Sequence, residues 1–210
     1  MINLKAKLSL NAGTVIQNMS QQEKDKFIEI TNDIISVLEK LPMGKERVES
    51  LKELDTHIKI NQIPSCKKGC SHCCYMKVSV MRSEAMVLAE HIRTNPGSIS
   101  MKRLRRQAKA KTVKEWQQLS FPDQRCVFLK ENLCTVYDDR PIACRYYFVV
   151  SDPELCRLDN AGRRGTIVTN ITATMHHAIE LAFASLKDEQ LNVGAETEPM
   201  AFTILEELLK

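Results

Sequence analysis

Glycine, proline and aromatic residues are scarce in this sequence. Glycine and proline number seven each among 210 residues, and aromatic side chains make up 5% of the chain. This composition argues against an all-β sandwich and against a disordered protein. Hydrophobic residues account for 43%, which is enough to build the core of one folded unit. We therefore expect a single domain over residues 1–210.

Long apolar runs and a strong net charge are absent as well. No stretch approaches the roughly 20 apolar residues that span a bilayer, and polar residues interrupt the N-terminal segment, which does not resemble a secretory signal. The formal net charge of +4 is small for this length and identifies no partner. The sequence therefore predicts a soluble, cytoplasmic protein without membrane association. Cysteines stay reduced in that compartment, so the eight cysteines need an explanation other than disulfides.

Helical periodicity recurs along the chain. Ser20 and Glu23 form a capping-box pattern, and apolar residues then repeat at helical spacing until Pro42. Further helices are expected over 45–57, over 84–93 after a cap at Ser83, from Ser98 or Ser100 to Leu119, over 173–186 and over 199–209. Proline, asparagine and aspartate in residues 121–147 favour turns and short extended pieces. The expected fold class is mainly α, a single helical domain with irregular cysteine-rich metal-binding loops.

Seven of the eight cysteines fall into two groups along the chain. The groups are Cys66, Cys70, Cys73 and Cys74, then Cys126, Cys134 and Cys144. Thiolates are soft ligands that bind zinc, copper(I) and iron–sulfur clusters, and close spacing lets one loop supply several of them. The alternative is a set of buried apolar thiols. Clustering in a reducing compartment favours metal binding by these seven, whereas Cys156 is expected to be a buried structural thiol.

The spacing within the first group constrains how its thiols share a metal. In a continuous helix over residues 66–74 the end thiols would be roughly 12 Å apart, which is too far for one small centre. Either Gly69 lets the loop wrap around the metal by adopting left-handed dihedrals, or the first group is shared between sites that the second group completes. The adjacent Cys73 and Cys74 point in different directions in any regular conformation. We therefore expect the two groups to meet in space.

Two runs of sequence carry a family resemblance. They are CKKGCSHCC at residues 66–74 and CVFLKENLCTVYDDRPIACR at residues 126–145. The chain resembles the YkgJ-type cysteine-cluster family there, in Tyr137 and Arg140–Pro141 as well as in the cysteines. The resemblance implies chelation of zinc or iron by a region over residues 64–147. A similar cysteine pattern occurs in the much longer flagellin lysine-N-methylases, which implies an iron–sulfur cluster, S-adenosylmethionine and, as an alternative function, transfer of methyl groups to protein lysine.

The identity of the metal and its surroundings is the next prediction. A cluster is larger than a single ion and more easily gathers thiolates from two loops, so an iron–sulfur cluster such as [4Fe–4S] is favoured over zinc. Arg140 and Arg145 flank Cys144 and could donate to sulfur and offset thiolate charge, or pair with Asp138 or Asp139. The leading functional prediction is a metal-binding accessory or sensor protein.

Two further interpretations concern chemistry elsewhere. The spacing of Cys66, Cys70 and Cys73 also matches the radical S-adenosylmethionine signature, but that chemistry uses a strand–helix barrel that the helical pattern does not predict. Cations crowd the helix expected after Ser100: Lys102, Arg103, Arg105, Arg106, Lys109, Lys111 and Lys114. Such a stripe could bind a protein partner or the phosphates of nucleic acid. The second case would make the protein a nucleic-acid factor with a structural metal. The competing interpretation is an ordinary solvated helix face, which is often charged. We expect Trp116 to be a packing residue.

Overall fold

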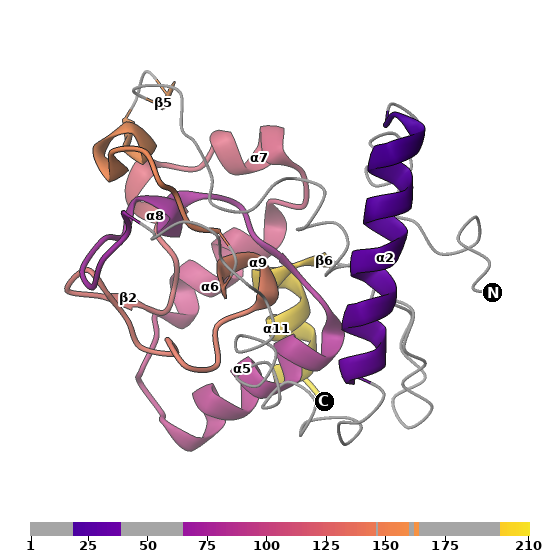
Figure 1. The fold of residues 1–210 in the computed structure, drawn as a ribbon. Helices are drawn as coiled ribbons and strands as arrows, with labels where there is room; N and C mark the ends of the chain where they lie inside the picture. The colour runs from indigo at the N-terminus through magenta and orange to yellow at the C-terminus, as the bar shows by residue number, and fades with distance from the viewer. Residues whose placement is uncertain (1–18, 39–64, 146, 160–161, 164–197) are drawn as a thin grey trace. The chain divides into compact units, whose positions relative to one another are not determined.

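The computed structural model describes residues 19–38, 65–145, 147–159, 162–163 and 198–210 (Figure 1). The chain divides into two compact units, residues 1–59 with 171–196 and residues 60–170 with 197–210. Within the described ranges, no helix is both long and apolar enough to span a bilayer. The helices expected over 45–57 and 173–186 lie outside the described residues, and the single domain over 1–210 stays a prediction.

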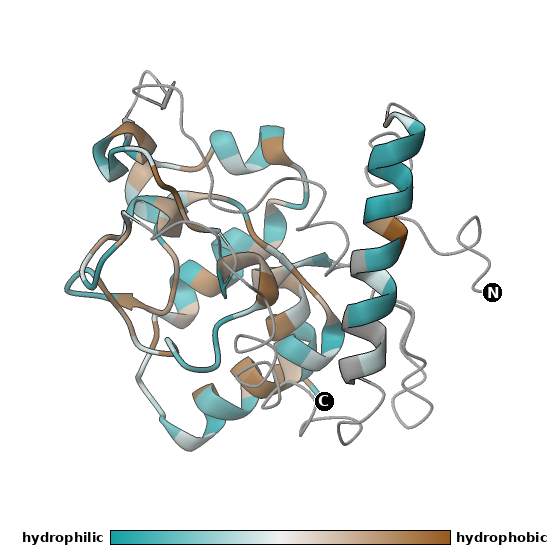
Figure 2. Ribbon diagram, in the orientation of Figure 1, coloured by the Kyte–Doolittle hydropathy of each residue, from teal (hydrophilic) through white to brown (hydrophobic). Residues whose placement is uncertain are grey.

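Helix α2 (Gln21–Leu38) is the described part of the first unit. The Ser20 N–H donates to the Glu23 carboxylate at 2.8 Å, and the Glu23 N–H donates to the Ser20 hydroxyl at 3.3 Å. This reciprocal pair is the predicted capping box. Most of the helix is hydrophilic, as Figure 2 shows, but Phe27 is buried. The helix predicted after Ser20 is confirmed over these residues.

Three helices form the core of the second unit. They are α5 (Arg82–Thr94), α6 (Met101–Lys109) and α11 (Met200–Leu208). α11 packs against both α5 and α6 (Figure 1). On α5 the buried residues recur at helical spacing: Ala85, Leu88, Ala89 and Ile92. Val127, Phe128 and Val136 from the second cysteine region join the same core, which therefore supports the cysteine loops.

The start of α5 differs from the prediction. Met81 is its N-cap, so Ser83 lies inside the first turn and is not the cap. The Glu84 carboxylate accepts the Met81 N–H at 2.8 Å. A side chain inside the helix thus satisfies a backbone donor at the start of the helix. The predicted helix over 84–93 is confirmed, but the predicted cap is wrong because α5 begins at Arg82, before Ser83.

The helix predicted from Ser98 or Ser100 to Leu119 is divided in two. The Ser100 hydroxyl accepts the Arg103 N–H and caps α6, as expected. A second capping box, formed by Thr112 and Glu115, starts the separate helix α7 (Val113–Gln117). The prediction of one continuous helix is wrong because this second cap satisfies a new helix N-terminus and lets the chain change direction.

Short elements connect the helices and carry most of the cysteines. The described ladders pair β1 (Ser79–Val80) with β6 (Glu198–Pro199), β2 (Leu129–Lys130) with β3 (Leu133–Cys134), and β4 (Leu158–Asp159) with β5 (Gly162–Arg163), all antiparallel. The short helices are η2 (His72–Tyr75), α8 (Phe121–Gln124), α9 (Ile142–Arg145) and η3 (Pro153–Cys156). The mainly helical prediction holds for the described residues, with turns and short pieces over 121–147 as expected.

Arg82 fastens α11 to α5 through ion pairs. Its guanidinium lies 2.8 Å from the Glu206 carboxylate and 2.6 Å from the Glu207 carboxylate, whose side chain is 6% exposed. Lys210 also donates to Glu207, at 2.8 Å. Burial by itself would raise the pKa of Glu207, but the hydrogen bonds from Lys210 and Arg82 outweigh it and hold the pKa below its usual value.

Replacing Arg82 by glutamine is expected to lower the free energy of unfolding at pH 7 by about 2 kcal/mol, because a buried carboxylate loses a cationic partner. The folded-state pKa of Glu207 lies below the unfolded value of 4.5, so its pairing stabilises the fold above that pH and is lost as the pH falls below it. Urea unfolding should therefore show a smaller difference between the two proteins at about pH 3.

The matched control is Arg105→Gln on the exposed face of α6, which should change stability by less than about 0.5 kcal/mol. An Arg82→Gln protein as stable as the original at neutral pH would show that these ion pairs contribute nothing.

Candidate metal centre

The structure brings the two cysteine groups together through backbone hydrogen bonds. The Cys126 N–H donates to the Cys74 carbonyl at 2.7 Å, which joins the end of the first group to the start of the second. At the other end of the first group, the Val149 N–H donates to the Cys66 sulfur at 3.5 Å, and the Ser65 N–H donates to the Val149 carbonyl at 2.8 Å. Two segments about fifty residues apart in the sequence are thus held side by side.

A tight hairpin shapes the second group. Glu131 and Asn132 both have positive φ, 50° and 61°, and connect β2 to β3 in a two-residue turn of left-handed conformation. The hairpin brings Cys134 opposite Leu129, only three residues after Cys126. The Ser71 hydroxyl lies 3.2 Å from the Asn132 side-chain oxygen, so the turn also contacts the first group.

Backbone N–H groups point at three of the sulfurs in the same way. In each case the donor is two residues further along the chain: His72 to Cys70, Phe128 to Cys126 and Val136 to Cys134. Burial raises the pKa of these thiols, that of Cys126 to about 12, and the N–H bonds act against it by stabilising the thiolate. The N–H bonds therefore offset only part of the cost of ionising these buried thiols.

Five thiols occupy one electrostatic neighbourhood, and we call them the inner thiols: Cys73, Cys74, Cys126, Cys134 and Cys144. A hydrogen bond from the Cys74 thiol lowers the pKa of Cys73 to about 7 and raises the pKa of Cys74. Burial, together with the charges of neighbouring thiolates, raises the pKa of Cys144 well above its usual value. These anions repel one another, and a bound cation would reverse the sign of that effect.

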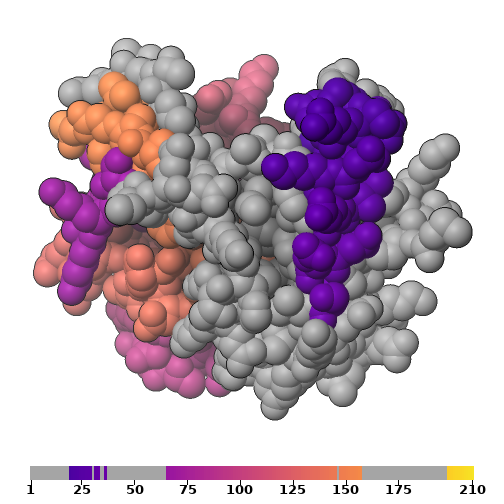
Figure 3. Space-filling view, viewed as in Figure 1, coloured from indigo at the N-terminus to yellow at the C-terminus, as the bar shows by residue number. Residues whose placement is uncertain are grey.

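The two remaining cysteines of the first group form a rim pair, Cys66 and Cys70. Their thiols are hydrogen-bonded to each other, and Cys70 reaches the inner thiols through its charge interaction with Cys73. All seven cysteines of the two groups are partly exposed, whereas Cys156 is buried in η3. Figure 3 shows the purple segment that starts at residue 65 at the surface beside the orange η3, which η2 contacts.

A closed site for a single ion is not formed. Within the described ranges, no group of three or more histidine, cysteine, aspartate or glutamate side chains has the geometry to hold a metal ion. The donor set nevertheless fits a metal centre chemically, because partly buried thiolates that share one neighbourhood require a compensating positive charge. The ligand role of the seven cysteines stays a prediction.

Arg140 lies where its charge reaches the inner thiols. Its guanidinium stacks 3.8 Å above the Tyr137 ring and 5.9 Å from the Phe148 ring, and its Nη1 donates to the Tyr137 carbonyl at 2.8 Å. From there its positive charge helps to lower the pKa of Cys73 and acts against the burial that raises the pKa of Cys134. Arg145 is buried and donates to the Asp138 backbone carbonyl at 2.6 Å.

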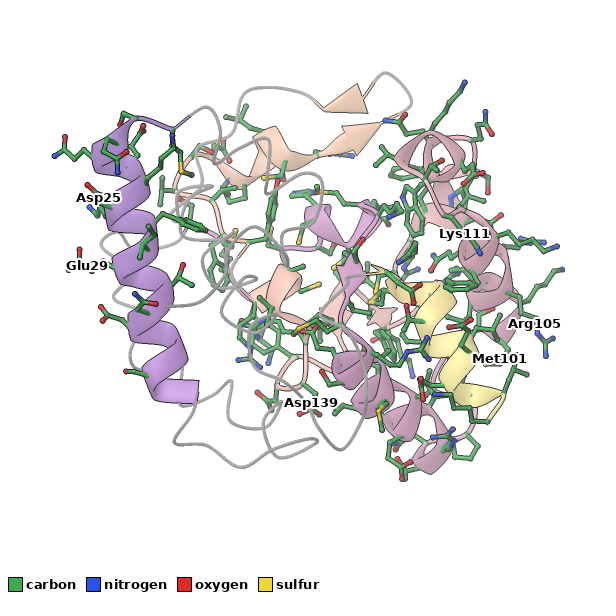
Figure 4. The ribbon with its side chains drawn as sticks, turned by 90° about the vertical axis from the view of Figure 1, so that its right-hand side faces the viewer. Asp25, Glu29, Met101, Arg105, Lys111 and Asp139 are labelled. Carbon is green, nitrogen blue, oxygen red and sulfur yellow. The ribbon has the colours of Figure 1, made fainter. Side chains whose placement is uncertain are left out.

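The predicted basic face is divided: five of its cations lie on α6, Lys111 follows that helix and Lys114 lies on α7. Lys102, Arg105, Arg106 and Lys109 are exposed at successive turns of one side, Arg103 is partly exposed, and Figure 4 shows Arg105 at the surface. Arg106 pairs with Asp123 at 2.8 Å. The opposite side of α6 is buried through Leu104 and Ala108, and nucleic-acid binding by this face stays a prediction.

One contact from Trp116 and one from Glu84 support the cysteine loops. Trp116 is buried, as expected, and its indole N–H donates to the Tyr75 carbonyl at 3.0 Å. Glu84 is not among the site residues predicted from the sequence. It is buried, and its carboxylate accepts the Ile142 N–H at 2.7 Å. Its position in the first turn of a helix is a local capping signal, but no local signal indicates a contact across 58 residues.

Comparison with known proteins identifies the cysteine region. Residues 65–163 match the model of the family CxxCxxCC, described as "Putative zinc- or iron-chelating domain". The match contains both cysteine groups and confirms the resemblance seen in the sequence. No curated protein and no solved structure matches the chain.

In the reduced, metal-free protein, iodoacetamide is expected to modify Cys73 faster than Cys126, because the thiolate is the nucleophile. The thiolate fraction of Cys73 rises as the pH rises through about 7, whereas Cys126 has a pKa of about 12. Peptide mass spectrometry after brief labelling at neutral pH measures both rates. The two rates should converge in urea, and equal rates in the folded protein would contradict this prediction.

Proposed function

We propose that this protein holds an iron–sulfur cluster through its clustered cysteines and works as an accessory or sensor protein. The match of residues 65–163 to the model of a zinc- or iron-chelating domain supports metal binding. The observation that carries the proposal is the set of five inner thiols within one neighbourhood, joined through Cys73 to the rim pair. This set is larger than the four ligands that a structural zinc ion takes.

The spread of the thiols favours a cluster over a single ion. A cluster is larger than one ion and accepts thiolates from separate segments of the chain. A [4Fe–4S] cluster takes four thiolates, and we assign these to the inner thiols, with only one of the hydrogen-bonded neighbours Cys73 and Cys74 required.

Charge around the site supports the same assignment. A cluster with four thiolate ligands carries net negative charge, which nearby cations stabilise. Arg140 is fixed by its stacking on Tyr137 and by its bond to the Tyr137 carbonyl, so its charge stays near Cys73 and Cys134. Arg145 would act through the backbone of the same segment rather than directly.

The partial exposure of the site supports the accessory or sensor role. All seven cysteines of the two groups are partly exposed, and reactive sensor thiols are accessible to oxidants. The cluster, when bound, would supply one-electron chemistry.

Protein purified without oxygen is expected to be brown and to contain iron and acid-labile sulfide. Its broad absorption at the blue end of the visible spectrum should bleach in air, because oxidation destroys exposed clusters. Metal and sulfide analysis with a visible spectrum measures this. The proposal would be overturned by colourless protein that contains stoichiometric zinc and no sulfide, provided that the host builds clusters. Methylation of protein lysine from S-adenosylmethionine would favour the enzymatic alternative.

Substitution of inner thiols tests which cysteines are ligands. Cys144→Ser and Cys134→Ser are each expected to lower metal affinity more than about 100-fold, because losing a ligand costs more than losing a group that supports one. Cys156→Ser, a buried thiol outside the two groups, is the matched control and should keep its metal. Metal content and chelator competition give the readout. Full affinity in both inner variants would separate these cysteines from the site.

A further inference from the structure

Glu84 connects two helices whose starts lie far apart in the sequence. Its side chain is buried, and one carboxylate oxygen accepts the Met81 N–H at 2.8 Å while the other accepts the Ile142 N–H at 2.7 Å. Met81 is the N-cap of α5, and Ile142 is the first residue of α9. One carboxylate therefore caps the helix that carries it and holds the start of another.

The helix held in this way carries an inner thiol. α9 spans only Ile142–Arg145, and Cys144 is its third residue. The N–H groups of Cys144 and Arg145 both donate to the Pro141 carbonyl, at 2.9 and 2.8 Å. A single turn is not stable by itself, so its position depends on contacts made at its ends. The bond from Ile142 to Glu84 is such a contact.

The other end of this connection is rigid. Ala85, next to Glu84, and Leu88, one turn further on, are fully buried in the core formed with α11. Helix α5 is also joined to α11 through the ion pairs of Arg82. Side chains carried by a packed helix are held more precisely in place than those on a loop. Glu84 thus links the position of α9 to the helical core.

We propose that Glu84 is a positioning residue for the metal centre, which fixes Cys144 at the other inner thiols by anchoring the start of α9. The inference rests on the proposed metal-binding function. Glutamine at this position would place an amide NH2 against one of the two backbone N–H groups. Aspartate is one methylene shorter and would not reach both donors, although it keeps the negative charge.

The test measures Zn2+ affinity by chelator competition, because Zn2+ binds thiolate sites whether or not iron is the native metal. Glu84→Gln and Glu84→Asp are each expected to weaken binding at least about tenfold, the usual cost of losing a group that orients a ligand. If charge alone mattered, the aspartate variant would bind like the original and overturn positioning. Glu90→Gln is the matched control: the Glu90 side chain on α5 is 46% exposed and pairs with Arg93 at 3.6 Å.

A double-mutant cycle separates positioning from general stability. In a Cys144→Ser background, Glu84→Gln should produce no further loss of affinity, because the residue acts through that thiol. An equal loss in both backgrounds, or no loss in the original one, would overturn the inference. If the original protein bound neither Zn2+ nor iron, the metal centre itself would fail, and the inference with it.

A measurement on the unmodified protein covers the case in which the Glu84 variants do not fold. The Ile142 amide should be protected from hydrogen exchange in the metal-loaded protein to nearly the same degree as the core amides of α5. Rapid exchange of this amide would overturn the inference, since it would show that the bond to Glu84 does not hold the start of α9.

Discussion

Repulsion between thiolates in a confined, partly buried space is the constraint on which the rest of the second unit depends. Each sulfur that ionises makes the next ionisation harder, so seven cysteines in two linked groups are costly unless a cation is shared among them. The loops offset part of this cost with backbone N–H groups directed at Cys70, Cys126 and Cys134. Arg140 offsets another part. The repulsion that these groups do not offset is the physical reason to expect a bound metal.

The first turn of α5 is where the helical core and the cysteine region meet. Arg82 extends to one side and binds the acidic end of α11, while Glu84 extends to α9. A change in the packing of α11 against α5 would therefore reach Cys144 through two residues of one helical turn. The cysteine loops have little regular structure of their own, so this turn and the hydrophobic contacts of Val127 and Phe128 determine where they lie.

Local signals in the sequence predicted the parts of this structure that depend on neighbouring residues. The cap at Ser20 and the helical spacing that follows are confirmed, because both partners of each contact lie within one or two turns. The cap at Ser83 was wrong because α5 begins before this residue, with Met81 as its N-cap. The break before α7 was missed, although Thr112 and Glu115 have the pattern of a capping box. The bond between Glu84 and Ile142 could not be predicted, since nothing local to either residue indicates the other.

The pairing of β1 with β6 has a consequence for when the centre can assemble during protein synthesis. Ser79 and Val80, just after the first cysteine group, pair with Pro199 and Glu198, and α11 then completes the core on which the loops rest. All seven cysteines of the two groups precede this helix in the sequence. During synthesis the thiols are therefore present before the core that positions them is complete.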